Sequence, residues 1–200
     1  EEVIRLLGGE LAPYSGDDVI LVNAYRMQGK TDQAKLVNQI LLFNNVINTL
    51  TLLNNYLSLN MDKPVLFEKI CFQGLQIIDS FKLKDILTND VFRIHITAAQ
   101  GYLSEQKKEE AVDALERYVD TACKVQFPLS FKGNEYFNRV AEWFEDNNCI
   151  GTNIPVDETT VKKNFVDTAA ENPAFASLKG DKRYNLLIEK LKEKLGETDK

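Results

Sequence analysis

The chain has 200 residues, of which 44% are hydrophobic and 27% charged, and its formal net charge is −6 at pH 7. This length suits one compact domain or a short array of helical repeats, and the composition excludes a collagenous or wholly disordered chain. An acidic surface repels phosphate backbones, so we do not expect these residues alone to bind nucleic acid. Polar residues interrupt every apolar run before 18 residues, so we expect no membrane-spanning helix and no membrane partner.

The three cysteines, Cys71, Cys123 and Cys149, are odd in number, widely spaced and without a CxxC pair. This usage predicts no disulfide framework and a reducing, cytoplasmic location, with each cysteine acting as a small core residue. The chain starts Glu-Glu-Val-Ile-Arg, without an initiator Met or a signal peptide, so we expect it to be a segment of a longer protein.

Apolar residues recur with helical periodicity along nearly the whole chain, and no strand series is convincing. A short helix is expected at residues 3–7, followed by a turn at residues 11–16. Asp17 or Asp18 is expected to cap the next helix, which Gly29 ends.

Thr31 is then expected to cap a helix. Residues 38–60 contain no Gly or Pro, which predicts one long helix or two abutting ones. Pro64 suits the first turn of the following helix, which should run to about Phe81.

The remaining elements follow from the same signals. We expect a helix capped by Thr88 or Asn89 and running to about residue 103, a helix at 106–125, a loop at 131–134, a helix at 135–145, a loop at 147–155, a helix capped by Asp157, a break at Asn172-Pro173, a short turn with Phe175 and Leu178, and a last helix capped by Asp181.

The sequence contains an internal repeat. A shift of 77 residues overlays one helix–turn–helix segment on another, and the matched positions are Ala24, Tyr25, Gly29, Lys30 and Ala34 with Gly101, Tyr102, Gln106, Lys107 and Ala111. A small residue allows two antiparallel helices to approach closely, and the neighbouring tyrosine fills the remaining gap. The pattern resembles the tetratricopeptide signature, and 77 residues correspond to about two degenerate repeats. A generic array of helical hairpins is the alternative.

Three stretches extend this likeness over nearly the whole chain. They are residues 11–17 with 24–29, residues 98–103 with 110–118, and the ending, in which Phe175 and Leu178 are followed by Asp181, Arg183 and Tyr184 and then by Leu187 and Leu191. The chain resembles the tetratricopeptide-like C-terminal region of bacterial Xre-type helix-turn-helix transcriptional regulators. The resemblance implies a regulatory domain that dimerises, senses a peptide or small-molecule effector, or does both, and that meets DNA only through an upstream domain outside this chain.

Enzyme chemistry finds no support in the sequence. The single histidine, His95, has no partner at a distinctive spacing, and the nucleotide-binding, metalloprotease and hydrolase motifs are missing. We therefore expect no catalytic residue, no metal site and no cofactor, and a structural role for His95.

A polar stripe is the candidate binding surface. Asn44, Asn48, Thr51 and Asn55 are spaced by four, three and four residues, so they share one side of a helix, opposite Phe43, Val46, Ile47, Leu50, Leu53 and Leu57. An Asn side chain both donates to and accepts from a peptide backbone. Arg26, Arg93 and Gln100 would add a carboxylate clamp or further amide contacts. A solvated face in an Asn-rich sequence is the alternative.

Aromatic residues gather in the less regular C-terminal third: Phe127, Phe131, Tyr136, Phe137, Trp143 and Phe144. They form either the small core that caps the array or an exposed patch for dimerisation.

These observations predict an all-α protein: a right-handed array of antiparallel, tetratricopeptide-like helical hairpins over residues 1–127, with a less regular helical cap at residues 128–200 packed on it as one continuous domain. The expected function is that of a regulatory, ligand-sensing or dimerising domain of a helix-turn-helix regulator, with a homodimer as the expected assembly. A free-standing tetratricopeptide-like adaptor for protein partners is the alternative function.

Overall fold

The protein is all-helical in the computed structural model, which describes residue 2 and residues 17–86, 89–127, 129, 131, 133–146 and 157–196. No strand occurs in those residues. The helices are α2 (Asp17–Met27), α3 (Thr31–Ser58), α4 (Pro64–Ser80), η1 (Leu83–Asp85), α5 (Asn89–Ser104), α6 (Lys108–Ala122), α7 (Val140–Asp146), α8 (Glu158–Ala170), η2 (Pro173–Leu178) and α9 (Lys182–Leu195).

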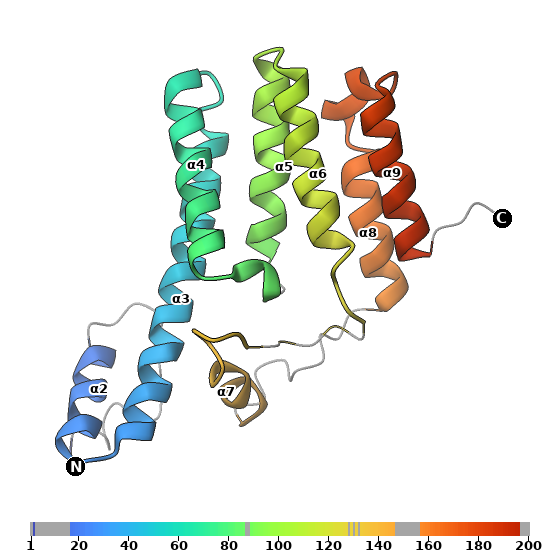
Figure 1. The fold of residues 1–200 in the computed structure, drawn as a ribbon. Helices are drawn as coiled ribbons and strands as arrows, with labels where there is room; N and C mark the ends of the chain where they lie inside the picture. Colours follow the sequence, from blue (N-terminus) through green and yellow to red (C-terminus); the bar gives the residue numbers. More distant parts are fainter. Residues whose placement is uncertain are drawn as a thin grey trace.

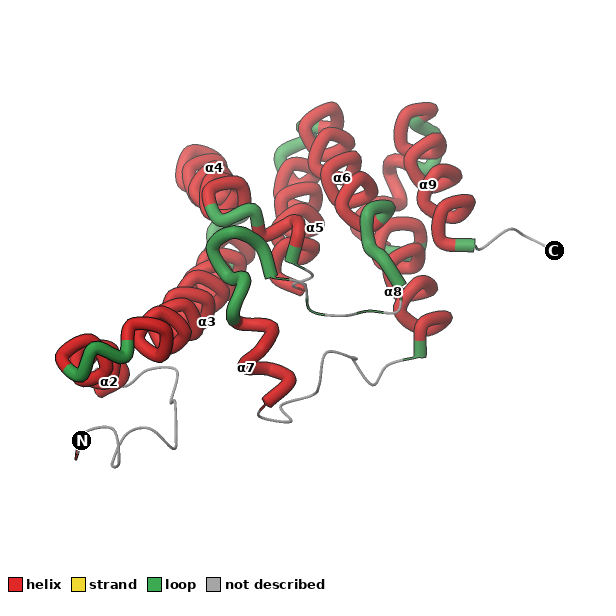
Figure 2. The backbone as a smooth tube through the Cα atoms, turned by 60° about the horizontal axis from the view of Figure 1, so that its bottom comes forward, coloured by secondary structure: helices red, strands yellow, loops and turns green. Residues whose placement is uncertain are grey.

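Three pairs of helices stand side by side in Figure 1: the C-terminal half of α3 with α4, α5 with α6, and α8 with α9. Helix α2 and the short α7 lie at the other end of α3, and the tube in Figure 2 shows only helices and loops. Helix α5 occupies the centre of the row, because it contacts α3, α4, α6 and η2. Nine of its 16 residues are buried.

Helix α3 is one continuous helix of 28 residues, which decides between the one long helix and the two abutting ones. Its N-terminal half packs on α2 through a small separate cluster of Leu21, Val37 and Leu41. Its C-terminal half packs on α4 and α5 through the main core, to which Leu50 and Leu57 contribute as fully buried side chains.

The 77-residue repeat has the same backbone geometry in both copies. Lys30 N donates to Tyr25 O at 2.9 Å, and Lys107 N donates to Tyr102 O at the same distance. Gly29 and Gln106 both adopt a left-handed conformation, with φ of 70° and 61°. The overlay therefore predicted a shared turn correctly, even where a non-glycine residue occupies the left-handed position.

The repeat's small residues do not all contribute to packing in the same way. Gly101 is buried, and a Cβ there would lie 2.1 Å from Cζ of Phe67 on α4. Ala34 and Ala111 are buried, while Ala24, Tyr25 and Tyr102 are half-buried. Gly101 thus brings α5 close to α4. The hairpin partner of α5 is α6, so this small residue serves a contact between hairpins rather than within one.

The motif at the end of the chain, from Phe175 to Leu191, connects the last two helices, α8 and α9. Phe175 and Leu178 are fully buried, and the Asp181 side chain caps α9 by accepting a hydrogen bond from Tyr184 N at 3.0 Å. The Tyr184 hydroxyl donates to Ala169 O of α8 at 2.9 Å. Arg183 forms ion pairs with Glu109, Asp113 and Glu116 of α6, which connect α9 to α6.

The aromatic residues of the C-terminal third face the core rather than forming a free patch, where the structure describes them. Phe137 is fully buried, and its ring lies 5.3 Å from that of Phe43 on α3. Phe131 also contacts Phe43, and Tyr136 is 38% exposed. Arg139 Nη1 donates to Asp32 O, which fixes this segment on the N-terminal half of α3.

Several expected boundaries are wrong. Thr31 is the first residue of α3 rather than its cap, and Lys30 at the cap position makes no side-chain capping bond. The helix expected at 106–125 spans Lys108–Ala122, because Gln106 is left-handed and cannot continue a helix. The helix expected at 135–145 begins only at Val140, after a turn in which Asn134 accepts from the backbone N–H of Tyr136.

Other expectations are confirmed. Pro64 occupies the first turn of α4, and Asp157 caps α8 by accepting from Thr160 N. The expectations for residues 3–7, 11–16 and 147–155, for the Asp17 and Asp18 side chains, and for Thr88, Phe144 and Cys149 lie outside the described residues and side chains.

By length and composition alone, α3 could cross a membrane, since its most apolar window has a mean hydropathy of 1.3. A core helix of a soluble protein passes the same test, so one such helix is weak evidence. Here α3 packs against α2, α4, α5 and α7. The sequence analysis required an uninterrupted apolar run, which α3 lacks. Length and mean hydropathy together are a weaker requirement, and α3 meets it.

Candidate functional site

The polar stripe of α3 lies between the buried side of the helix and its most exposed side, which carries Leu42, Leu52 and Tyr56. Asn44, Asn48 and Thr51 are half-buried, and Asn55 is exposed. The Thr51 hydroxyl donates to Ile47 O of its own helix at 3.1 Å.

Two of the predicted site residues meet across helices. Arg93 of α5 donates from Nη2 to Asn55 Oδ1 at 3.1 Å, and from Nη1 to Asp90 Oδ1 at 3.3 Å. Gln100, half-buried, lies two turns further along the same side of α5 as Arg93. The stripe and the polar side of α5 therefore form one continuous surface.

Arg26 does not join this surface. It is exposed near the C-terminal end of α2, which packs on the opposite half of α3. At 1.5 Å per residue, the 21 residues from Ala34 to Asn55 place these two ends of α3 about 30 Å apart. A ligand that contacts both Arg26 and Asn55 would have to be an extended chain.

A second candidate site is a recess between α4, α5 and α6, with a volume of about 130 Å³. It is lined by Cys71 and Leu75 of α4, by His95, Ala98 and Tyr102 of α5, and by Glu110, Asp113, Ala114 and Arg117 of α6. The sequence analysis assigned His95 a structural role and did not connect it with these residues. The one available signal was the spacing of Glu110, Asp113 and Arg117, which places all three on one side of α6.

His95 is the most unusual group in this recess. Only 1% of the residue is exposed, and Nε2 has no hydrogen-bond partner among the residues that the structure describes. Burial, followed by the positive charges of Lys84 and Arg117, lowers the pKa of His95 to about 4. The imidazole is therefore neutral at pH 7, and Nε2 can donate or accept one hydrogen bond according to its tautomer.

The thiol beside it is also uncharged. Burial raises the pKa of Cys71, against the lowering effect of the hydrogen bond that the Tyr102 hydroxyl donates to its sulfur. A neutral thiol is a poor nucleophile and a poor metal ligand. Within the described residues, no group of three or more His, Cys, Asp or Glu side chains is arranged to hold a metal ion. The recess thus combines a neutral imidazole and a neutral thiol with the charged side chains of α6.

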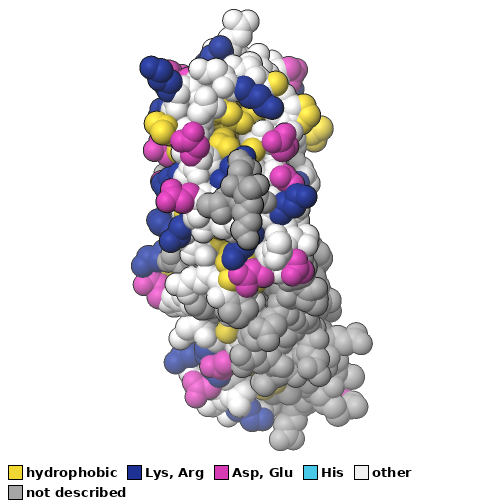
Figure 3. Space-filling model, turned by 90° about the vertical axis from the view of Figure 1, so that its right-hand side faces the viewer, with side chains coloured by type: hydrophobic (Ala, Val, Ile, Leu, Met, Phe, Trp, Pro, Cys, Tyr) yellow, Lys and Arg dark blue, Asp and Glu magenta, His cyan; other side chains and the backbone are white. Residues whose placement is uncertain are grey.

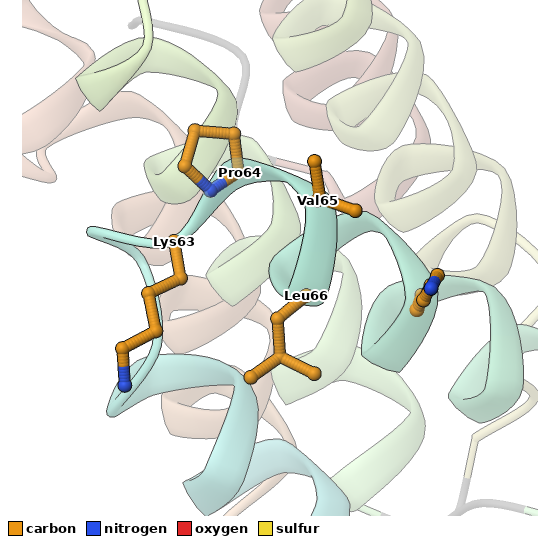
Figure 4. Close-up of a pocket in the computed structure, with 5 residues that line it drawn as sticks. Lys63, Pro64, Val65 and Leu66 are labelled. Carbon is orange, nitrogen blue, oxygen red and sulfur yellow. The ribbon is translucent and has the colours of Figure 1, made fainter.

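An open hollow of about 340 Å³ lies at the start of α4 and is lined by Lys63, Pro64, Val65, Leu66 and Lys69 (Figure 4). Val65 is 69% exposed, and the nearby Leu59 and Phe72 are 77% and 58% exposed. The Lys63 ammonium donates to Asn60 Oδ1 at 3.1 Å. This end of the α3–α4 pair therefore presents hydrophobic side chains next to two lysines.

The opposite end of the row has a different surface. Basic and acidic side chains alternate over the α8–α9 side in Figure 3, with small hydrophobic patches between them. Ion pairs such as Lys190 with Asp120 at 2.7 Å account for part of this alternation. Among the described residues of this face, neither sign of charge forms an extended region.

Comparisons with protein-family models, curated proteins and solved structures find no match to this chain.

Proposed function

We propose that this chain is a tetratricopeptide-like regulatory domain of a helix-turn-helix transcriptional regulator. The observation that carries the proposal is the motif at the end of the chain, from Phe175 to Leu191. The residues of this motif that contribute to the resemblance make defined contacts in the fold. Phe175 and Leu178 fill the core, Asp181 caps α9, and Tyr184 bonds back to α8.

The repeated hairpin turn gives independent support. The small–Tyr–turn–Ala pattern produces the same main-chain hydrogen bonds at Tyr25 and at Tyr102. A right-handed array with a concave surface is the architecture that such repeats build, and the stripe on α3 with Arg93 and Gln100 is its candidate ligand surface.

The mechanism is a shift between two populated states. A peptide or small-molecule effector that binds one arrangement of the helices more tightly than another changes their relative populations. In a homodimer this change would alter the spacing of two upstream DNA-binding heads, and the spacing of half-sites on DNA is fixed by helical geometry.

The test is to sequence the coding region immediately upstream of Glu1 and to express the whole reading frame. The proposal expects an in-frame helix-turn-helix segment, sequence-specific binding of the whole protein to duplex DNA, and a dimer by light scattering. A reading frame without that segment, or a whole protein that binds no DNA, would overturn it.

The stripe has its own test once a ligand of the whole protein is known. Replacing Asn48 and Asn55 with Ala should weaken ligand binding and lower the melting temperature by no more than a few degrees, because neither side chain is fully buried. Asn45→Ala is the matched control: this exposed residue lies on α3 outside the stripe and bonds only its own helix, at Leu41 O. Equal affinity in all three proteins would remove the stripe from the site.

One observation favours the alternative, a free-standing adaptor for protein partners. Leu59 and Val65 are exposed hydrophobic side chains at one end of the α3–α4 pair, and the exposed Phe72 lies two turns further along the same side of α4. Such patches are typical of protein-binding surfaces. An adaptor would be a monomer without DNA affinity, and Val65→Ser with Phe72→Ser would abolish its partner binding.

A further inference from the structure

The recess between α4, α5 and α6 holds a polar group that the fold leaves unsatisfied. A buried polar atom without a partner destabilises a fold, so folds rarely keep one without a reason. Nε2 of His95 is such an atom among the described residues, and it is almost inaccessible from the recess that the His95 ring lines. The recess is roomy enough for several water-sized groups, so a molecule bound there would supply the missing partner once the imidazole turns toward it.

The wall formed by α6 carries two charges that are not used within the described part of the chain. Glu110 and Arg117 make no ion pair or side-chain hydrogen bond there, whereas Asp113 pairs with Arg183 at 2.6 Å. Glu110 and Arg117 are seven residues apart on one side of α6, about 10 Å along the helix axis. They do not neutralise each other, and a molecule between them meets one charge of each sign.

We propose that this recess binds a small zwitterion of the free amino-acid class. Its carboxylate pairs with Arg117, its ammonium group pairs with Glu110, and a small turn of the buried imidazole lets a polar atom of the ligand bond Nε2 of His95. The apolar lining of Leu75, Ala98 and Ala114 accepts a short side chain, and the volume of about 130 Å³ excludes a folded peptide.

The alternatives are less compatible with these groups. A multiply charged anion such as phosphate would meet the carboxylates of Glu110 and Asp113 together with a single arginine, so like charges would oppose it. A simple cation would meet Arg117. Only a ligand with both charges is complementary to both ends of the wall.

This inference goes beyond the proposed function and does not depend on it, because the recess lies within this chain and an adaptor could hold the same ligand. The site also lies on the side of α5 opposite to Arg93, so it is separate from the polar stripe.

The single histidine makes the site directly observable. With ¹⁵N-labelled histidine, every imidazole resonance in the NMR spectrum belongs to His95. The chain is titrated with each of the twenty L-amino acids separately, and with acetate and methylamine as single-charge probes. The tested variants are Arg117→Gln and Glu110→Gln. Lys108→Gln is the matched control, because Lys108 is an exposed residue of α6 that does not line the recess.

We expect at least one amino acid to shift the His95 resonances saturably, with a Kd of about 1 mM or tighter. Each recess variant should weaken that binding by about tenfold or more, because a charge-assisted bond is lost. The Lys108→Gln control should bind as the wild type does. All substituted residues are exposed, and circular dichroism will verify that the variants fold.

Three results would overturn the proposal. They are the absence of any shift of the His95 resonances by all twenty amino acids, unchanged affinity in both recess variants, and acetate or methylamine binding as tightly as the best amino acid. DNA binding by the whole protein is measured separately, so either proposal can fail while the other stands.

Discussion

Gly101 of α5 offers a sharp test of how the helices are spaced. A Cβ at this position would lie 2.1 and 2.3 Å from two atoms of the Phe67 ring, against at least 3.4 Å for an ordinary contact. Phe67 is fully buried, and its ring packs edge-on against Tyr102 at 5.5 Å, so it has little room to move aside. Gly101→Ala should therefore force α4 and α5 apart.

Two opposing terms set the magnitude. Overpacking of a close-packed core costs roughly 1–3 kcal/mol, while replacing glycine with alanine within a helix gains about 0.5–1 kcal/mol. We expect a net loss of about 1–2 kcal/mol in the free energy of unfolding. For a chain of this length that corresponds to a fall of roughly 2–8 °C in melting temperature, measured by circular dichroism.

Gly180→Ala is the matched control, because no atom lies within 4 Å of the added methyl group. Its melting temperature should stay the same or rise slightly. In a Phe67→Leu background the added methyl should cost less than in the wild type, since the ring atoms that it meets are gone. A Gly101→Ala protein that melts at or above the wild-type temperature would refute the reasoning.

Three further predictions follow from single residues. Burial lowers the pKa of His95 from 6.5 to about 4, so between these pH values the folded state binds fewer protons than the unfolded state. The free energy of unfolding should therefore fall as the pH falls through this window. NMR titration of His95 measures the pKa, and a value near 6.5 would contradict the prediction. Asn54 is fully buried with neither amide atom partnered, so Asn54→Leu should stabilise the protein by about 1–2 kcal/mol in urea unfolding, and a loss would mean that the amide has a partner. Tyr184→Phe removes the buried bond to Ala169 O and should cost about 1 kcal/mol in the same assay; no change would show that this bond adds nothing to stability.

The sequence predicted best where the deciding interactions are local. Helix caps such as Asp157 and Asp181 bond a backbone N–H three residues away, so both partners are visible in a short window of sequence. The repeated turn is equally local: all its hydrogen bonds join residues at most five positions apart. The overlay matched Gly29 with Gln106, and both are left-handed, although residue 106 is expected from the sequence to begin a helix.

Long-range packing explains the failures. The segment before α7 is a turn because Asn134 donates to the carbonyl groups of Phe81 and Lys82, more than 50 residues away. Periodicity within residues 135–145 contains no trace of that contact. The unpaired Nε2 of His95 is likewise created by the arrangement of three helices, and a single sequence shows only a histidine beside apolar neighbours.

The same reasoning explains why one candidate site was partly foreseen and the other was missed. Asn44, Asn48, Thr51 and Asn55 lie on one helix, so their spacing reveals a shared side without knowledge of the fold. Arg26 was added by analogy with a neighbouring repeat, and the length of α3 places it too far away for a compact ligand.

Helix α5 separates the two candidate sites. Arg93 and Gln100 are seven residues apart and share one side of the helix, while His95 and Tyr102, also seven apart, share the other. Arg93 bonds Asn55 of α3, and His95 lines the recess with α4 and α6. A substitution of Arg93 therefore changes the stripe without entering the recess, and a substitution of Arg117 does the reverse. If one ligand lost affinity in both variants, the cause would have to pass through α5 itself or through α4, which packs on α3 and lines the recess with Cys71 and Leu75.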